Sequence, residues 1–124
     1  MEKIKAYTDL EQSKKLAEIL PIESADMYWW PTSLRYYIEA MDDGDFNEKE
    51  GHIRAWSLAA LLNLIPKHIK EHSVLRIDID ENTFAMWYDE IGYGVNLELP
   101  DIEMSELVDA CYEMIIKLNE LNLL

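Results

Sequence analysis

The stretch VLRIDIDENTFAMWY, residues 74–88, carries the clearest structural pattern in the chain. Over residues 74–80, apolar residues alternate with charged ones, and this period of two is typical of a strand with one buried face. Glu81 and Asn82 predict a turn, and the aromatic and apolar run over residues 84–88 predicts a second strand. The stretch therefore indicates an antiparallel hairpin.

A third strand and a last helix are predicted downstream of the hairpin. Apolar and polar residues alternate over residues 95–99, as expected for a strand that continues the sheet. Asp101, directly after Pro100, can cap a helix whose apolar stripe covers residues 107–121. We therefore expect an α+β protein, with helices packed on one face of a small, about three-stranded antiparallel sheet and a long amphipathic helix at the end.

Three helical patterns precede the hairpin. Thr8 followed by Glu11 has the spacing of a capping box, which predicts an amphipathic helix over residues 9–20. Apolar residues recur at intervals of three and four over residues 34–41, which predicts a second helix. Residues 52–65 are apolar on nearly every face, as expected for a central buried helix.

Size and composition are those of one small domain. The chain has 124 residues, of which 49% are hydrophobic, so residues 1–124 are expected to form a single domain with its own core. Cys111 is the only cysteine, which rules out an intrachain disulfide and is typical of a reducing compartment. The longest apolar run, residues 55–65, contains Ser57 and Asn63, and no signal-peptide pattern precedes it. We expect a soluble, cytoplasmic protein that does not enter a membrane.

Charge is distributed unevenly along the chain. The formal net charge is −14, and residues 77–116 contain 11 acidic residues but no lysine, arginine or histidine. A surface of this sign repels phosphate backbones and anionic lipid headgroups, because proteins bind these largely through Lys and Arg. The composition therefore argues against direct binding of nucleic acid or of membranes, and it favours a basic protein partner. It is equally typical of a surface that only keeps the protein soluble.

Two segments carry a resemblance to a known family. Residues 6–28, AYTDLEQSKKLAEILPIESADMY, resemble the opening of a family of small, acidic, uncharacterised proteins from intestinal anaerobic bacteria, often associated with prophages or other mobile elements. Residues 55–66, AWSLAALLNLIP, resemble the second stretch that the family shares. The resemblance implies a bacterial cytoplasmic origin, and it implies no catalytic residue, because the family has no assigned activity.

His68, Glu71 and His72 form an HxxEH motif. On a helix, this spacing places two zinc-binding imidazoles one turn apart with a carboxylate base between them, as in inverzincin metallopeptidases. Here the motif occupies a short segment between Pro66 and a predicted strand, and no third ligand in a helical context follows it. A solvated polar linker is the main interpretation, and a small zinc-dependent hydrolase is the alternative.

A second group of oxygen-bearing side chains lies on the predicted hairpin. Positions 1, 3, 5 and 12 of a calcium-binding loop are matched by Asp78, Asp80, Asn82 and Asp89. Thr83 stands where such a loop needs glycine, and strands flank the segment instead of helices. This excludes an EF-hand and leaves either an ordinary hairpin surface or a weak cation site. We expect neither a resident metal ion nor a cofactor.

Taken together, these patterns favour a non-enzymatic interaction protein that binds a basic partner through its acidic C-terminal half. A narrower hypothesis is nucleic-acid mimicry, in which carboxylates reproduce an array of phosphates. The adjacent tryptophans at positions 29 and 30 could add an aromatic rim, because tryptophan often anchors interfaces. The candidate interaction residues are Asp78, Asp80, Glu98, Asp101, Glu106, Asp109, Glu113, Trp29 and Trp30.

The leucines near the C-terminus leave the oligomeric state open. The apolar stripe of the last predicted helix continues through Leu118, Leu121, Leu123 and Leu124. In a homodimer, this stripe would pack against the same stripe of a second copy. Cys111 lies on the same stripe among acidic neighbours, which raise a thiol pKa, and it is expected to be an inert core residue.

Overall fold

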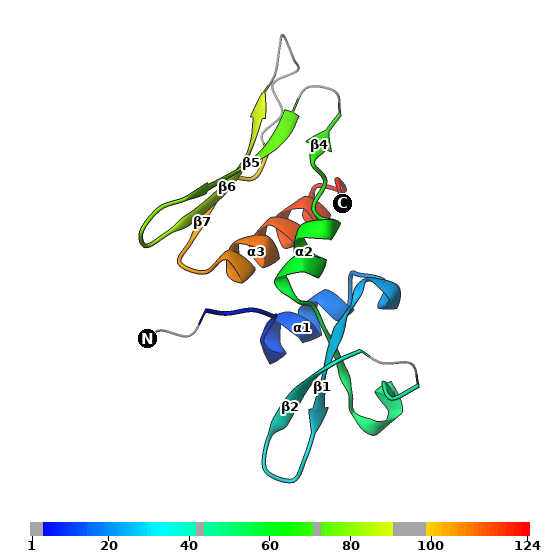
Figure 1. The fold of residues 1–124 in the computed structure, drawn as a ribbon. Helices are drawn as coiled ribbons and strands as arrows, with labels where there is room; N and C mark the ends of the chain where they lie inside the picture. Colours follow the sequence, from blue (N-terminus) through cyan, green and yellow to red (C-terminus); the bar gives the residue numbers. More distant parts are fainter. Residues whose placement is uncertain (1–3, 42–43, 71–72, 91–98) are drawn as a thin grey trace.

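The computed structural model describes residues 4–41, 44–70, 73–90 and 99–124 (Figure 1). The helices in this part of the chain are α1 Leu10–Ala17, α2 Leu58–Leu64 and α3 Leu107–Glu120, with short 3-10 helices η1 Ile22–Ser24 and η2 Glu48–Glu50. The strands are β1 Met27–Pro31, β2 Tyr36–Ala40, β3 Ile53–Ala55, β4 His68–Ile69, β5 Ser73–Ile79, β6 Phe84–Glu90 and β7 Ile102–Met104. The predicted α+β class with a long C-terminal helix is confirmed.

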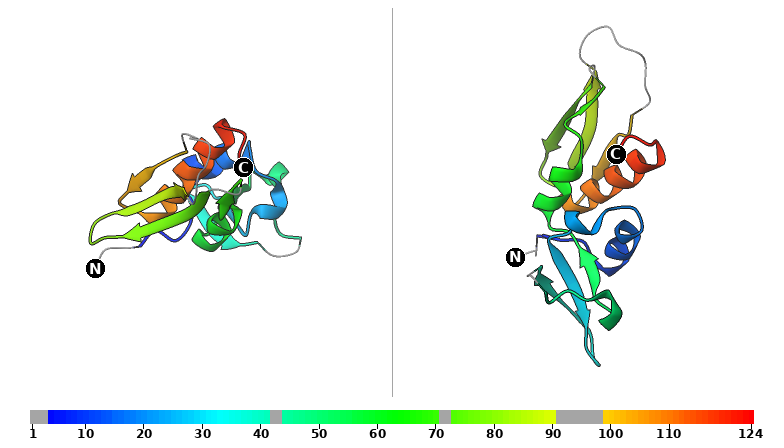
Figure 2. Two further views of the ribbon diagram at one scale, coloured as in Figure 1. Left: turned by 90° about the horizontal axis from the view of Figure 1, so that it is seen from above. Right: turned by 90° about the vertical axis from the view of Figure 1, so that its right-hand side faces the viewer.

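Two antiparallel sheets lie at opposite ends of the molecule, with the helices between them (Figures 1 and 2). The first sheet has the strand order β2-β1-β3, and the second has the order β4-β5-β6-β7. The second sheet contains the predicted hairpin. The first sheet comes from residues for which the sequence indicated helices, and it was not predicted.

β2 occupies the segment of the second predicted helix, so that prediction is wrong. Tyr36, Tyr37 and Ile38 are aromatic or β-branched, and such residues favour strands. The turn before them is closed by Thr32, whose backbone N–H and hydroxyl both donate to the carbonyl of Arg35, at 2.9 and 2.7 Å. The turn directs β2 back along β1, which is why the apolar spacing does not produce a helix here.

The predicted hairpin is formed by β5 and β6. These strands pair along their full lengths, from Ser73 opposite Glu90 to Ile79 opposite Phe84. The turn is closed by a hydrogen bond of 2.9 Å from the backbone N–H of Asp80. Only the first half of β5 is buried as predicted, since the hairpin extends beyond the helices and Ile79 is 68% exposed.

β7 occupies the segment in which the sequence placed the start of the last helix. Asp101 therefore does not cap a helix, and this prediction is wrong. Apolar and polar residues alternate through the segment, which suits a strand. α3 begins only after Glu106, whose side chain makes no capping hydrogen bond. The third strand predicted at 95–99 lies, at residues 95–98, outside the described part of the chain.

The first predicted helix is confirmed, but it has a different cap and is shorter. Its capping box is formed by Asp9 and Gln12: the Asp9 carboxylate accepts from the backbone N–H of Gln12 at 2.8 Å, and the Gln12 side chain accepts from that of Asp9 at 3.1 Å. The expected pairing of Thr8 with Glu11 is therefore wrong by one residue. Thr8 is instead buried, with its hydroxyl 2.7 Å from that of Ser13.

The predicted buried helix over residues 52–65 is divided into β3 and α2. Ser57 causes the division, because its hydroxyl accepts from the backbone N–H of Ala60 at 3.2 Å and so caps α2. Trp56, directly before this cap, is fully buried, and its indole N–H donates to the hydroxyl of Ser24 at 3.0 Å. The break thus places a large aromatic ring in the core.

One cluster of buried side chains extends from α1 to the four-stranded sheet. It includes Leu16 of α1, Trp56, Leu61 of α2, Met86 of β6 and Met114 of α3. α3 packs against β6 and β7 on one side and against α2 on another. Burial of large apolar side chains stabilises the fold by about 1.5–3 kcal/mol each, so α3 is the main link between the sheet and the rest of the molecule.

Candidate functional site

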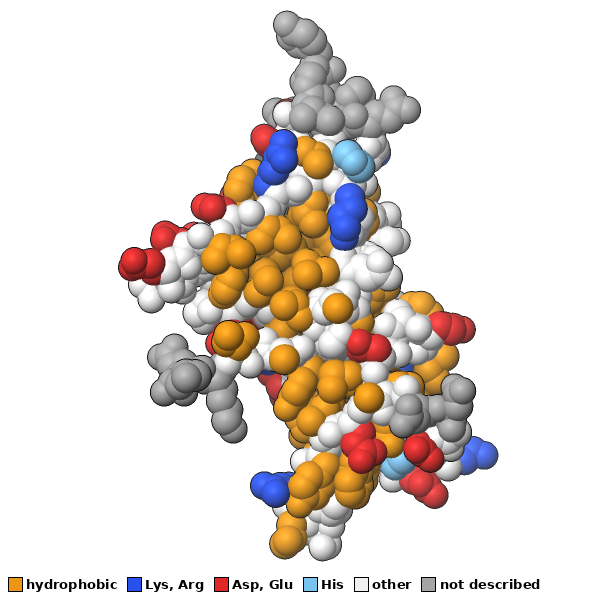
Figure 3. Space-filling model, viewed as in Figure 1, with side chains coloured by type: hydrophobic (Ala, Val, Ile, Leu, Met, Phe, Trp, Pro, Cys, Tyr) orange, Lys and Arg blue, Asp and Glu red, His pale blue; other side chains and the backbone are white. Residues whose placement is uncertain are grey.

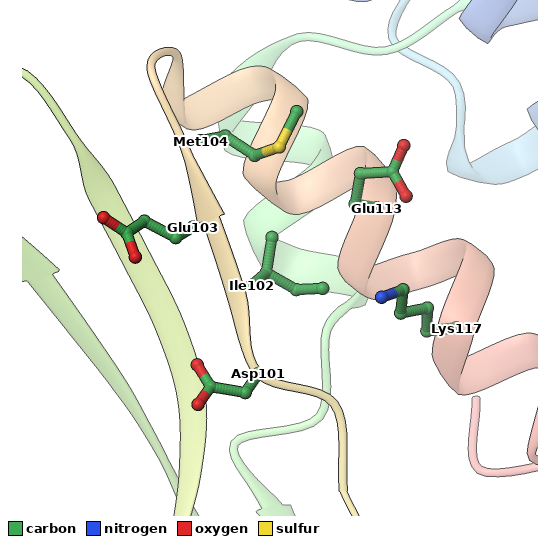
Figure 4. A pocket seen from close by; sticks show the side chains of 6 residues that line it. All are labelled: Asp101, Ile102, Glu103, Met104, Glu113 and Lys117. Atoms are coloured by element: carbon green, nitrogen blue, oxygen red, sulfur yellow. The ribbon is translucent and has the colours of Figure 1, made fainter.

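The four-stranded sheet has one face against α3 and one face turned away from it. Met86 and Ile102 are paired across β6 and β7, and both are buried on the α3 side. The next row of the sheet runs from Asp78 through β6 to Glu103, and it points to the opposite side, because side chains alternate along a strand. Figure 4 shows Asp101 and Glu103 directed away from α3. The register thus gathers acidic residues of β5 and β7 on one outer face.

We call the exposed carboxylates of this outer face and the adjoining hairpin turn the acidic face; it consists of Asp78, Asp80, Glu81, Asp101 and Glu103. None of these side chains makes an ion pair with another described residue. The Asp80 carboxylate accepts from the backbone N–H of Glu81 at 2.7 Å. In Figure 3, acidic side chains are visible at the hairpin turn, on the left of the view. Their charges face solvent, where a cation can approach them.

One ion pair lies on the same side of the sheet. Arg76 Nε is 3.6 Å from Asp89 Oδ2, with side chains that are 53% and 55% exposed. An exposed pair of this kind contributes about 0–1 kcal/mol to stability. Trp87, paired with Arg76 across the two strands, is partly buried. Arg76 is the only basic residue in β5, β6 and β7, and its charge is matched by Asp89.

Two of the candidate interaction residues have partners within the chain. Lys5 Nζ lies 2.7 Å from Asp109 Oδ1, and the side chain of Gln12 donates to the same oxygen at 2.8 Å. The backbone N–H of Lys5 donates to Glu106 at 3.4 Å. These contacts attach the N-terminal segment to the first turn of α3. Asp109 and Glu106 are therefore assigned a structural role and are not part of the acidic face.

The contacts of Lys5 shift two pKa values. Burial lowers the pKa of Lys5, but its hydrogen bonds to Asp109 and Asp9 outweigh burial and raise the pKa above its ordinary value. Burial raises the pKa of Asp9, but the backbone N–H of Gln12 and the charge of Lys5 outweigh it and hold the pKa below its ordinary value. Both groups thus stay ionised over a wider pH range than they would in an unfolded chain.

A groove runs between β7 and α3. Its first part has a volume of about 250 Å³ and is lined by Asp101, Ile102, Glu103, Met104, Glu113 and Lys117 (Figure 4). Its second part, of about 290 Å³, lies beyond β7, between residues 99–100 and the end of α3, and is lined by Leu99, Pro100, Lys117, Glu120 and Leu121. Lys117 borders both parts, which are therefore adjacent. Ile102 and Met104 point toward α3 and form an apolar floor, and charged side chains stand along the rim.

Trp29 and Trp30 lie in β1, in the sheet at the other end of the molecule from the acidic face (Figure 1). Both are partly buried. The indole N–H of Trp29 donates to the carbonyl of Thr8 at 3.1 Å. Trp30 stacks on Tyr37 with ring centroids 5.1 Å apart, and the guanidinium of Arg35 lies 4.7 Å from the Tyr37 ring on the same hairpin. The structure therefore does not bring the tryptophans together with the acidic residues.

The HxxEH motif is only partly described. His68 begins the two-residue strand β4 and is exposed, so it lacks the helical setting that the zinc motif needs. Glu71 and His72 lie outside the described residues. The zinc-hydrolase alternative thus stays an untested prediction.

Asp78 and Asp89, two of the residues that match a calcium-binding loop in sequence, do not lie close together in the structure. Asp78 is paired with Ala85, whereas Asp89 is paired with Val74, four residues further along the hairpin. At about 3.3 Å per residue, these two carboxylates are roughly 13 Å apart along the strands. Among the described residues, no three His, Cys, Asp or Glu side chains are placed to hold a metal ion.

Cys111 is buried in α3, and its sulfur is 4.0 Å from that of Met86. Burial raises the pKa of its thiol to about 12. A thiol with this pKa is almost fully protonated at neutral pH, so it is a poor nucleophile and a poor metal ligand. The prediction of a core cysteine is confirmed.

Comparison of the chain with protein-family models, curated proteins and solved structures found no match. The family resemblance of residues 6–28 and 55–66 stays a prediction. Among the described residues, no helix combines the length and the apolar character needed to span a bilayer.

Sequence reasoning missed the groove and the strand that forms one of its walls. The signal was present, because Ile102 and Met104 alternate with Asp101, Glu103 and Ser105. This period of two predicts a short strand with an apolar inner face and an acidic outer face. Glu98, the remaining candidate, lies outside the described residues.

Proposed function

We propose that this protein is a non-enzymatic interaction module that binds a basic protein partner through its acidic face. The observation that carries the proposal is that Asp78 and Glu103 lie on one exposed side of the sheet, with Asp101 directly before β7, and that none of the three makes an ion pair with a described residue. Like charges held close together by a rigid sheet repel one another, and an approaching cationic surface relieves this repulsion. Such a surface attracts basic proteins and repels nucleic acids and anionic lipids.

A narrower form of the proposal concerns the kind of partner. A basic partner of an acidic protein is often one that binds nucleic acid, and carboxylates on a sheet can occupy its phosphate sites. The absence of any cationic residue from 77–116 favours this form, as does the resemblance to mobile-element proteins. We place this activity in the bacterial cytoplasm.

The test compares two variants with equal changes in net charge. The first, Asp78→Asn with Glu103→Gln, neutralises the acidic face; the control, Glu11→Gln with Glu23→Gln, neutralises two exposed carboxylates of the N-terminal half. Immobilised wild type, the acidic-face variant and the control are used to capture partners from a bacterial extract at low salt. The captured proteins are identified and then purified for direct binding measurements.

We expect a basic protein whose affinity for wild type falls steeply between about 0.05 and 0.5 M salt, because the Debye length shortens over this range. The acidic-face variant should bind it about tenfold more weakly, and the control should bind it as wild type does. Partners that are not basic, or that bind the acidic-face variant as tightly as the wild type, would contradict the proposal.

A further inference from the structure

β7 is the last strand of the four-stranded sheet, so one of its edges has no neighbouring strand in the described part of the chain. A strand edge presents backbone N–H and C=O groups to which another strand can pair. We propose that this edge binds an extended, lysine- or arginine-rich segment of the partner by β-strand addition, with the segment lying in the groove between β7 and α3. The inference rests on the proposed function, because it specifies how the basic partner is bound.

The hydrogen-bond pattern of the sheet shows which groups of β7 are free. The backbone N–H of Asp80 donates to the carbonyl of Thr83, so these two residues form a hydrogen-bonded pair. Bonded and non-bonded pairs alternate along an antiparallel ladder, so Ala85 is also bonded to β5. The backbone groups of the next residue, Met86, then point to β7, where its partner is Ile102.

By the same alternation, Ile102 and Met104 are bonded to β6, and the N–H and C=O of Glu103 between them point away from the sheet. Outside the β6–β7 ladder, the backbone of Glu103 makes no hydrogen bond to another described residue. By the same alternation, the backbone N–H and C=O of Asp101, two residues earlier, point to the same side as those of Glu103. A strand laid along this edge would therefore exchange a pair of backbone hydrogen bonds with Glu103 and continue alongside Asp101.

Carboxylates lie on both sides of such an added strand. The residue opposite Glu103 points to the outer face, where a basic side chain forms a cross-strand pair with Glu103 and lies near Asp101. The residues before and after it point into the groove, toward Ile102 and Met104. There, the aliphatic stem of a lysine or arginine covers the apolar floor while its charge reaches Glu113 on the rim.

The acidic charge of the groove favours a basic partner segment over a second copy of this chain at the β7 edge. The first part of the groove is lined by three carboxylates and one lysine, Lys117. If two β7 edges paired with each other, the acidic residues of one strand would lie beside those of the other, and like charges across a ladder are destabilising. The net charge of −14 on each chain adds long-range repulsion.

The test uses an octapeptide of alternating lysine and valine with blocked ends, and the same peptide N-methylated at alternate residues. N-methylation removes backbone donors from one edge and leaves the charge unchanged; two N-methylated forms, offset by one residue, cover both edges. Binding is measured by calorimetry or by fluorescence anisotropy. We expect the unmodified peptide to bind, and one methylated form to bind about tenfold or more weakly, because it loses several backbone hydrogen bonds.

Three variants separate backbone pairing from charge. Glu103→Pro removes the free N–H without removing a bond to β6, and prolines are tolerated at such edge positions; we expect about tenfold weaker binding of the peptide. Glu103→Gln keeps the N–H and should weaken binding about threefold. Glu23→Gln removes an exposed carboxylate from η1, outside the acidic face, and should change binding less than about twofold. Circular dichroism verifies that each variant is folded.

The outcomes distinguish this inference from the proposed function. If both methylated peptides bind as the unmodified one does, strand addition is overturned even if Glu103→Pro cannot be purified folded. If no peptide binds but lysozyme, a folded basic protein, still binds with a salt dependence that Asp78→Asn with Glu103→Gln reduces, strand addition is overturned and the proposed function stands. If neither probe binds, both are overturned.

Discussion

Asp109 and Glu103 are both carboxylates of the C-terminal third, but their surroundings differ. Asp109 is in contact with Lys5 and Gln12, which are 104 and 97 positions away in the sequence. Glu103 is exposed and makes no ion pair with another described residue. Asp109 therefore contributes to the stability of the fold, whereas Glu103 is available to a partner. The local sequence does not distinguish them, because it is similarly acidic around both.

Replacement of Asp109 by asparagine should destabilise the fold. The change leaves the ammonium group of Lys5 without its closest anion, which lies at 2.7 Å, and it weakens the bond from Gln12. We expect the free energy of unfolding, measured by urea titration, to fall by about 1–3 kcal/mol. Glu113→Gln, on the same helix but without an ion pair to a described residue, should change it by less than about 0.5 kcal/mol. Equal effects of the two changes would contradict the structural role of Asp109.

The capping carboxylate of α1 should make stability depend on pH in the acid range. The pKa of Asp9 is lower in the folded chain than its ordinary value of 3.8, so its charge stabilises the fold above pH 3.8, and this contribution is lost as the pH falls through the folded pKa. Asp9→Ala should lower the free energy of unfolding by about 1 kcal/mol near pH 7. The difference between wild type and variant should shrink as the pH falls below 3.8. A difference that stays constant would show that the charge of Asp9 is unimportant.

The thiol of Cys111 should be unreactive in the folded protein. Burial raises its pKa to about 12, so at about pH 8 nearly all of it is protonated and shielded from reagents. We expect a thiol-specific dye to label the native protein at the rate of global unfolding, and to label the urea-unfolded protein within seconds to minutes. Rapid labelling of the native protein would show that α3 opens locally around Cys111.

At the scale of elements, the sequence predicts best where local and tertiary preferences agree. The hairpin is found because its period of two and its turn residues indicate the same structure, and residues 107–120 have an apolar stripe that suits a helix. For residues 34–41 the two signals conflict: the apolar spacing fits a helix, but Tyr36, Tyr37 and Ile38 prefer a strand. Pairing with β1 decides between them, and this pairing has no local signature.

The candidate site could be predicted only in part for a similar reason. The sequence places Asp78 on the polar side of β5 and Asp80 directly after the strand, because alternation is a local property. It could not show that Lys5 binds Asp109, because that contact depends on the tertiary fold. It also could not show that β7 ends the sheet, since strand order is set by packing.

Two glycines allow a matched test of the contact between Gly51, which directly follows η2, and Pro31 at the end of β1. Gly44 and Gly51 have φ values of +94° and +85°, which L residues rarely adopt. A Cβ at Gly51 would lie 3.2 Å from Pro31 Cγ, whereas a Cβ at Gly44 would contact nothing within 4 Å. We expect Gly44→Ala to cost about 1–2 kcal/mol in free energy of unfolding, and Gly51→Ala to cost about 1 kcal/mol more. Equal costs would show that Pro31 moves aside freely.

At the scale of the whole molecule, the two ends of the structure have different surfaces. The three-stranded sheet carries Trp29 and Trp30, and the four-stranded sheet carries the acidic face, with the helices between them (Figures 1 and 2). A single small partner cannot contact both ends at once. If the acidic face binds the proposed basic partner, we expect it to do so without the tryptophans, with salt concentration as the main control of the affinity.

The same charge should keep the protein monomeric. Leu118, which the sequence left available for a homodimer, is fully buried in the chain's own core, and its carbonyl accepts from the backbone N–H of Leu123 at 2.9 Å. Leu121 and Leu124 are 48% and 43% exposed, and two half-exposed leucines fall far short of the roughly 800 Å² per partner of a stable interface.

Light scattering should therefore give the monomer mass of 14.6 kDa at low salt, where the net charge of −14 keeps copies apart. At about 0.5 M salt this repulsion is screened, and the mass should stay the same because the end of the α3 stripe offers only two half-exposed leucines for an interface. A doubled mass that Leu121→Asp returns to the monomer value would contradict this, since the exposed leucines would then have to form an interface strong enough to overcome the charge.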